Sequence, residues 1–356
     1  MPNITLNVIR IFFLGSISFI FALLTAPALT HFLYKHKLWR KKVRHKTIDG
    51  KDISYFKKFH SKGEVSVPRF GGLLIWGIPL ALSFLLFFLS KTNIPFLERL
   101  NFLSRSQTWL PLFALVAASL VGLLDDILQV SENNSKLNKY IGGGLRLSYR
   151  LAAVSLIGLV GGWWFYFKLG YNTIHIPGDG DVFIGWWYIP LFVLVMLATY
   201  SGGVIDGLDG LAGGVFAIIF AAFGGIALFN GQYDLAAFCV VVAGAILAFL
   251  WFNIPPARFY MGETGTMGIC AVLTVISFLT DSVLVLPIIA FLLAIESGSV
   301  IVQLFWKKFF HKKFFLAAPI HHHFEVKGWP HYKITMRFWV IGAIAALVGL
   351  AIRLLG

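Results

Sequence analysis

The chain has 356 residues, of which 58% are hydrophobic and only 13% are charged. A soluble domain is about half apolar and about a quarter charged. This composition therefore excludes a disordered chain, a collagen-like fibre and a disulfide scaffold, and it indicates a polytopic membrane protein. Lys and Arg number 30 against 16 Asp and Glu, a net charge of +14.

Along the chain, about ten apolar runs approach the length needed to cross a bilayer, which is about 20 residues. No small-residue cleavage site follows the first run, so we predict that it remains as a transmembrane helix. Trp and Tyr cluster at several run ends, as they do at membrane interfaces. The prediction is an all-α polytopic membrane protein with one domain over residues 1–356. The predicted spans are 8–33, 71–89, 109–124, 147–167, 186–200, 211–229, 235–252, 266–279, 283–306 and 334–355.

The positive charge of the chain is concentrated on one side of this arrangement. With an even number of spans both termini lie on one side, and about four fifths of the Lys and Arg residues then fall on the other. Cytoplasmic loops carry such an excess, so this side is predicted to be cytoplasmic and both termini periplasmic or extracellular. Basic segments at a membrane attract anionic lipid headgroups. The charge thus predicts contact with membrane lipid and no nucleic-acid partner.

The first acidic pair on the predicted cytoplasmic side is Asp125 and Asp126, directly after the apolar run that ends at residue 124. The C-terminal end of a helix disfavours anions, so the pair costs stability unless a cation is near. One interpretation is a solvated helix end. The other is a divalent-metal or general-base site, because Mg²⁺ binds one or two carboxylates together with substrate phosphate oxygens.

Two further polar clusters precede the sixth and the eighth predicted spans. Asp206 and Asp209 are three residues apart among glycines. They would share a face on a helix, or they would cap a helix from a glycine-rich turn. Pro255-Pro256 is predicted to end a helix. The segment 262–266 then combines glycines and hydroxyls at a helix start, which suits an anion.

Three consecutive histidines, 321–323, lie in the last large loop. Consecutive helical residues point about 100° apart, so on a helix the three cannot all bind one metal ion. They are candidates for proton carriers or charge stabilisers beside a phosphate, and the alternative is an ordinary solvated loop. Glu296 lies inside the ninth predicted span. An acid there is a candidate functional group, and we interpret it as a hydrogen-bonded residue that ties helices together.

These motifs occur in an order that resembles one known family. They are Asp125-Asp126, the stretch 206–212, the stretch 253–263, the stretch from Ala318 to Trp329, and the ending Arg337-Phe-Trp. From Gly71 to the C-terminus the chain is similar to phospho-N-acetylmuramoyl-pentapeptide transferases, within the superfamily of polyprenyl-phosphate N-acetylhexosamine-1-phosphate transferases.

The resemblance implies a multi-pass, ten-helix enzyme of the bacterial inner membrane, with its active site in cytoplasmic loops. In the implied reaction, the phosphate of undecaprenyl phosphate attacks the β-phosphate of UDP-MurNAc-pentapeptide. The products are lipid I and UMP, and Mg²⁺ is required. The resemblance also implies a homodimer.

The same resemblance implies roles for individual residues. Asp125 matches the family's base, or the acid on the lipid-phosphate side, and Asp126 matches its partner. His321 is the first choice among the histidines near the diphosphate. Glu263 stands at the family's metal-binding position, and Asp126 and Asp206 complete the implied metal set. The residues implied on the nucleotide and substrate side are Asp209, Asn253, Tyr260, His322, His323, Lys62 and Lys136.

The chain departs from the family pattern at several positions. The family has Asp at Glu263, Asn at Gly203 and Lys at Gln129, and the segment Val67-Pro-Arg69-Phe-Gly-Gly resembles the wider superfamily. An alternative function is therefore transfer from UDP-GlcNAc or another UDP-N-acetylhexosamine. A catalytically impaired lipid-binding relative is a further hypothesis. A transporter is disfavoured, because transporters bind their substrates near mid-membrane and these acids lie at helix ends.

Overall fold

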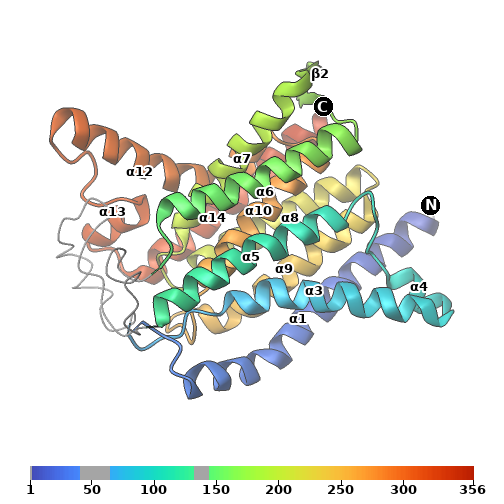
Figure 1. The fold of residues 1–356 in the computed structure, drawn as a ribbon, viewed down its shortest axis with the longest axis horizontal. Helices are drawn as coiled ribbons and strands as arrows, with labels where there is room; N and C mark the ends of the chain where they lie inside the picture. The colour runs from blue at the N-terminus through green and yellow to red at the C-terminus, as the bar shows by residue number, and fades with distance from the viewer. Residues whose placement is uncertain (1, 41–64, 132–143) are drawn as a thin grey trace.

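The protein, seen in a computed structural model, is a bundle of long helices described over residues 2–40, 65–131 and 144–356 (Figure 1). The long helices are α1 (Pro2–Lys35), α3 (Gly72–Leu89), α5 (Trp109–Val130), α6 (Leu147–Lys168), α7 (Tyr188–Gly202), α8 (Leu211–Phe229), α9 (Tyr233–Asn253), α10 (Gly262–Leu279), α12 (Phe291–Phe310) and α14 (His331–Leu355). The short ones are η1 (Ser90–Thr92), α4 (Pro95–Leu100), η2 (Gly185–Trp187), η3 (Gly203–Ile205), α11 (Leu286–Ile289) and α13 (Ile320–Val326).

Nine helices in the described ranges are long and apolar enough to cross a membrane, and they match nine of the predicted runs. The exception is the predicted span 283–306. There α11 ends at Ile289, and the backbone leaves helical geometry at Ala290 before α12 begins. α12 also carries Glu296 and two lysines in its last turn, and it leans away from the bundle in Figure 1. The prediction of about ten regular spans is therefore corrected to nine candidate spans and one broken segment.

A β-hairpin between α6 and α7 is a small departure from the predicted all-α fold. β1 (Thr173–Ile176) pairs with β2 (Gly180–Phe183) in antiparallel register, with Ile176 opposite Gly180. The N–H of Gly178 in the turn donates to the carbonyl of Gly356, the last residue, at 2.5 Å. The hairpin therefore anchors the end of α14 and lies where the sequence predicts an outer loop.

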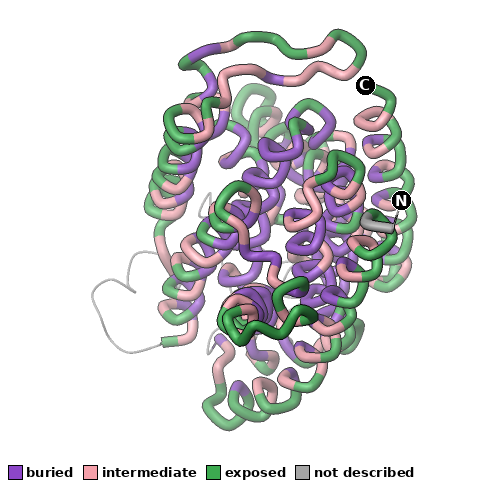
Figure 2. The backbone as a smooth tube through the Cα atoms, turned by 90° about the vertical axis from the view of Figure 1, so that its right-hand side faces the viewer, coloured by how far each residue is buried: buried purple, intermediate pink, exposed green. Residues whose placement is uncertain are grey.

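α10 lies at the centre of the bundle, where Figure 2 shows buried positions surrounded by exposed ones. It buries 17 of its 18 residues, and Glu263 in its first turn is the exception. α5 packs along α10. A Cβ on Gly122 of α5 would lie 2.1 Å from the carbonyl oxygen of Glu263, so this close approach requires glycine. The approach brings the acids of α5 beside the start of α10.

The two chain ends lie toward the end of the bundle opposite α13 (Figure 1). Near the N-terminus, Arg10 of α1 pairs with Asp234 of α9 at 2.8 Å. The side of the membrane on which each terminus lies, and the side that faces the cytoplasm, stay predictions.

Candidate active site

The adjacent acids Asp125 and Asp126 are buried inside α5, at 1% and 0% exposure. The sequence suggested that they close the helix, but α5 continues to Val130. They therefore do not form a solvated helix end. Because burying an unpaired charge is costly, the groups that contact these carboxylates define the site.

The first turn of α10 contacts the carboxylate of Asp126 and also that of Asp206. The backbone N–H of Thr264 donates to Oδ2 of Asp126 at 2.9 Å, and the N–H of Gly262 donates to the carboxylate of Asp206. A helix N-terminus favours anions, because its first amides have no partner within the helix. The segment 262–266, predicted as an anion cradle, thus binds two carboxylates of the protein itself.

Asp206 lies in a glycine-rich turn between η3 and α8 and not on a helix. Loss of water around its carboxyl raises the pKa to about 6, against the lowering effect of nearby Arg69. Glu263 and Asp209 also contribute to that raised pKa. The mutual repulsion indicates that these acids gather at one place and would favour an added cation.

Asp125 has both carboxylate oxygens occupied. Oδ1 accepts the backbone N–H of Leu145, and Oδ2 accepts Nε2 of Gln129 at 2.6 Å. Nη1 of Arg150 lies 3.8 Å from Oδ2. These contacts fix the orientation of the carboxylate.

Two arginines bring positive charge to the acids. Nη1 of Arg150 lies 2.6 Å from Oε1 of Glu263, and Nε of Arg69 lies 3.5 Å from Oδ1 of Asp126. Arg69 is positioned by main-chain pairing around it. The N–H of Tyr260 donates to the carbonyl of Pro68 at 2.7 Å, and the N–H of Gly71 donates to the carbonyl of Tyr260 at 2.8 Å.

The residues predicted for the nucleotide side bind the surrounding loops. Oδ1 of Asn253 accepts the N–H of Gly210, and its Nδ2 donates to the carbonyl of Phe259, both at 2.9 Å. Oδ2 of Asp209 accepts the N–H of Ala257 at 3.1 Å. Asn253 and Asp209 therefore hold the 206–210 turn against the 253–260 loop. Their contact with a nucleotide stays a prediction.

The three histidines lie on α13 and have different partners. Nδ1 of His321, which is fully buried, lies 2.9 Å from Oε2 of Glu296. Nδ1 of His322 lies 2.8 Å from Oε2 of Glu325, whereas Nδ1 of His323 accepts the N–H of Leu316 at 3.1 Å. Burial, together with the positive charge of Lys327, lowers the pKa of His323. Glu296 does tie α12 to α13, as interpreted from the sequence.

The donor chemistry of this cluster fits Mg²⁺, which prefers oxygen ligands. Oδ1 of Asp126 is buried and accepts no hydrogen bond from the described residues. Across the described ranges, no three His, Cys, Asp or Glu side chains gather closely enough to hold a metal ion by themselves. The predicted set of Glu263, Asp126 and Asp206 therefore stays a prediction. One or two of these carboxylates with substrate oxygens would match the ion's usual ligands.

Comparison with known proteins places the chain in a family. A family model described as glycosyl transferase family 4 matches residues 108–281. Three relatives carry the name phospho-N-acetylmuramoyl-pentapeptide-transferase. That of Chloroflexus aggregans is 30% identical over 360 residues, 97% of this chain and 90% of its own length. That of Geobacillus kaustophilus is 37% identical over 256 residues (70% and 75%), and that of Geobacillus sp. strain WCH70 is 35% identical over 253 residues (69% and 75%).

The chain belongs to glycosyl transferase family 4. This confirms the resemblance found in the sequence motifs. It also shows that the chain is a membrane protein of a phosphoglycosyl transferase family. The donor sugar and the dependence on Mg²⁺ are questions for experiment.

Gln129 stands at a position where the resemblance to phospho-N-acetylmuramoyl-pentapeptide transferases implies Lys. Oε1 of Gln129 accepts Nη2 of Arg40, which is 5% exposed, while its Nε2 donates to Asp125. The positive charge of Arg40, a residue that follows α1, therefore acts on Asp125 indirectly, through the side-chain amide of Gln129.

Two other departures from the pattern are also explained locally. A Cβ on Gly203 would meet Cβ of Thr266 at 3.6 Å, an ordinary contact, so packing alone does not require glycine there. Glu263, one methylene longer than the family's Asp, pairs with Arg150 at 2.6 Å.

Some residues of the site were not predicted from the sequence. Arg40 and Arg150 were predicted only as part of the positive charge, whereas Thr264 belongs to the predicted anion cradle 262–266. Each of the two arginines lies close to the end of a predicted span on the side of the acids, but arginines that set topology share this position. Of the residues predicted for the site, Lys62 and Lys136 lie outside the described residues.

Proposed function

We propose that this protein transfers phospho-MurNAc-pentapeptide from UDP-MurNAc-pentapeptide to undecaprenyl phosphate, giving lipid I and UMP. The observation that carries the proposal is the cluster of Asp125, Asp126 and Glu263 with Arg69 and Arg150 at one end of the helix bundle. The names of relatives at 30–37% identity support the same donor.

The proposed reaction exchanges one phosphorus–oxygen bond for another. An oxygen of the lipid phosphate bonds to the β-phosphorus of the donor, and the bond from that phosphorus to the bridging oxygen breaks, releasing UMP. Such a transfer needs positioning and neutralisation of phosphoryl charge. Arg69 and Arg150 supply fixed positive charge beside the carboxylates. Mg²⁺, when bound, would neutralise phosphoryl oxygens further, and Asp126 with Asp206 or Glu263 would hold it.

Asp125 is proposed as the base that takes a proton from the lipid phosphate, or as the acid that faces it. Its two oxygens are held by Leu145 and Gln129, so the carboxylate has one orientation. His321 is proposed beside the diphosphate, with His322 and His323 on the nucleotide side. Asp209, Asn253 and Tyr260 are proposed to support the nucleotide through the two loops that they join.

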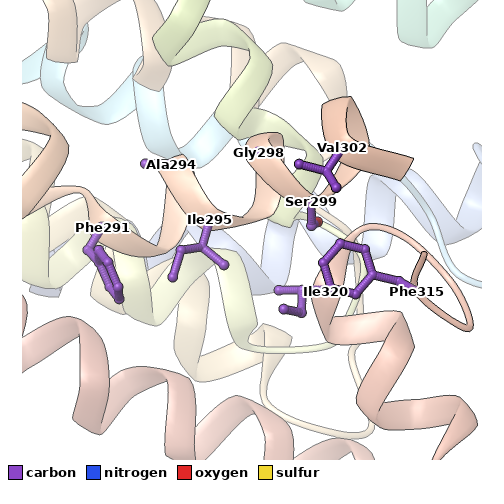
Figure 3. A pocket seen from close by; sticks show the side chains of 8 residues that line it. All are labelled: Phe291, Ala294, Ile295, Gly298, Ser299, Val302, Phe315 and Ile320. Atoms are coloured by element: carbon purple, nitrogen blue, oxygen red, sulfur yellow. The ribbon is translucent and has the colours of Figure 1, made fainter. Parts of the chain in front are cut away.

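An apolar groove supports a polyprenyl phosphate as the acceptor. It has a volume of about 350 Å³ and runs along α12, with Phe315 and Ile320 on its far side (Figure 3). Ile320 directly precedes His321. The apolar surface of the groove would favour the isoprenoid chain. The phosphate at the polar end of that chain would lie outside the groove, toward the buried His321.

The proposed setting is the cytoplasmic face of the bacterial inner membrane, with both termini on the other side and the enzyme as a homodimer. The concentration of Lys and Arg in the loops on the side of the acids supports this sidedness. Bacterial relatives support the bacterial membrane.

A second donor class has one observation in its favour. The segment Val67–Gly72 resembles the wider superfamily, and its Arg69 lies 3.5 Å from Asp126. Transfer from UDP-GlcNAc or another UDP-N-acetylhexosamine is therefore the alternative.

A donor comparison tests the proposal. Purified protein in detergent is incubated with undecaprenyl phosphate, Mg²⁺ and each UDP-sugar in turn, and UMP is measured. We expect UMP from UDP-MurNAc-pentapeptide and little from UDP-GlcNAc. Turnover of UDP-GlcNAc with none of the pentapeptide donor would replace the first proposal by the second.

A further inference from the structure

Glu296 is a fully buried acid of α12, and within the described residues its side chain pairs with a histidine. Both Glu296 and His321 are 0% exposed, and Oε2 of Glu296 lies 2.9 Å from Nδ1 of His321. A buried ionisable group is costly unless it is paired. The pair joins α12 to α13, the short helix that carries the three histidines.

The pair determines which nitrogen of His321 is available for chemistry. With Glu296 as a carboxylate, which only accepts hydrogen bonds, Nδ1 carries the hydrogen and donates it to Oε2. The tautomer of a histidine is commonly fixed in this way by the bond that its other nitrogen makes. Nε2 is therefore the nitrogen that faces away from Glu296 and can accept or donate a proton.

Nε2 of His321 points at the glycine-rich turn that carries Asp206. A Cβ built on Gly207 would lie 2.3 Å from Nε2, and Gly207 directly follows Asp206. Nε2 is buried and makes no hydrogen bond within the described residues. An orphaned buried nitrogen is uncommon, because leaving such a group unpaired costs about 1–3 kcal/mol. Because Gly207 has no side chain, Nε2 of His321 can lie against the turn that carries Asp206.

We infer that Glu296 is a positioning residue of the transferase, which holds His321 with Nε2 toward the substrate phosphates and balances the positive charge of the ring when Nε2 is protonated. The inference rests on the proposed function. A protonated Nε2 would donate a hydrogen bond to a phosphoryl oxygen, and such charge-assisted bonds are the stronger ones. Glu296 would then act through His321 and not through the substrate.

A neighbouring histidine–glutamate contact has a different hydrogen-bond pattern. Both oxygens of Glu325 are occupied, by Nδ1 of His322 at 2.8 Å and by Nε2 of His331 at 2.5 Å. That carboxylate bridges α13 and α14. Glu296, in contrast, has one oxygen, Oε1, without a hydrogen bond in the described ranges, so its pairing serves one histidine.

Glu296→Gln tests the inference, because it removes the charge at nearly constant volume. We expect kcat for UMP release to fall by about 10–100-fold, the usual cost of losing such a supporting partner, with the KM for the nucleotide donor nearly unchanged. The matched control is Ser297→Ala, the next residue on α12, which loses only a 3.0 Å hydrogen bond from Ser201 and should keep wild-type kcat. Wild-type kcat in Glu296→Gln, or an equal loss in both variants, would overturn the inference.

A double-mutant cycle separates positioning from structure. If Glu296 acts through His321, then Glu296→Gln adds no further loss of kcat to His321→Asn, whereas a separate structural role would make the losses multiply. Should the Gln variant not fold, Glu296→Asp goes through the same cycle with the same criterion. Failure of the proposed function would look different, because the wild-type protein would then release no UMP at all.

Discussion

Asp125→Asn removes the proposed base at constant volume, and its cost can be worked out from the contacts. Asp125 accepts two hydrogen bonds, from the N–H of Leu145 and from Nε2 of Gln129. An asparagine has one acceptor oxygen, so its NH₂ group must face one of those donors. Gln129 cannot turn its amide to help, because its oxygen accepts from Arg40. One contact between two donors results, which costs about 1–3 kcal/mol of unfolding free energy.

The ion pairing changes less than the hydrogen bonding. Arg150 lies 3.8 Å from Asp125 but also 2.6 Å from Glu263, so its guanidinium keeps a carboxylate partner. The fold should therefore survive. Loss of a general base lowers a rate by about 10²–10⁴-fold, and we expect kcat to fall by that factor. UMP release measures the rate, and the apparent melting temperature in detergent measures the stability.

The matched control for this prediction is Asp234→Asn, at the other end of the bundle. It breaks a 2.8 Å ion pair with Arg10 and should leave kcat unchanged. Near-normal turnover of Asp125→Asn in a stable protein would remove Asp125 from the mechanism. An equal loss of kcat in both variants would assign the effect to folding.

The remaining predictions concern other parts of the site. Glu263→Asp, which restores the family's residue and gives up reach toward Arg150, should keep or raise turnover; loss of the Mg²⁺ dependence would contradict a metal role for Glu263. Gly207→Ala puts a methyl group 2.3 Å from Nε2 of His321 and should lower kcat sharply. Gly225→Ala, whose nearest neighbour would be 3.7 Å away, should not, and equal activity of the two variants would refute the position of His321. EDTA should stop UMP release and added Mg²⁺ should restore it, whereas turnover in EDTA would argue against a metal.

The membrane helices were largely predictable, because a spanning helix is encoded in local hydropathy. The segment 283–306 was not, since Ala290 carries no local signal for a break. The break accompanies the packing of α11 against α14, a contact between parts of the chain far apart in sequence. The length of α5 was also underestimated, because Asp125 and Asp126 look like a helix end until their buried partners are known.

The acids of the site were predictable from their chemistry, but their cationic partners were not. Arg150 is 113 residues from Glu263 in sequence, and nothing local distinguishes it from an arginine that sets topology. The same holds for Arg40, which reaches Asp125 only through Gln129. The partner of Glu296 was equally hidden, because the contact with His321 requires α13 to fold against α12.

The fate of the β-phosphate tests the central claim most directly. UDP-MurNAc-pentapeptide labelled at the β-phosphorus is incubated with the protein, undecaprenyl phosphate and Mg²⁺, and the label is followed into the lipid and aqueous phases. Transfer of a phosphosugar predicts that the β-label moves into the lipid while unlabelled UMP is released. Label recovered in the aqueous phase as UDP, with the sugar alone on the lipid, would contradict the reaction proposed for this site.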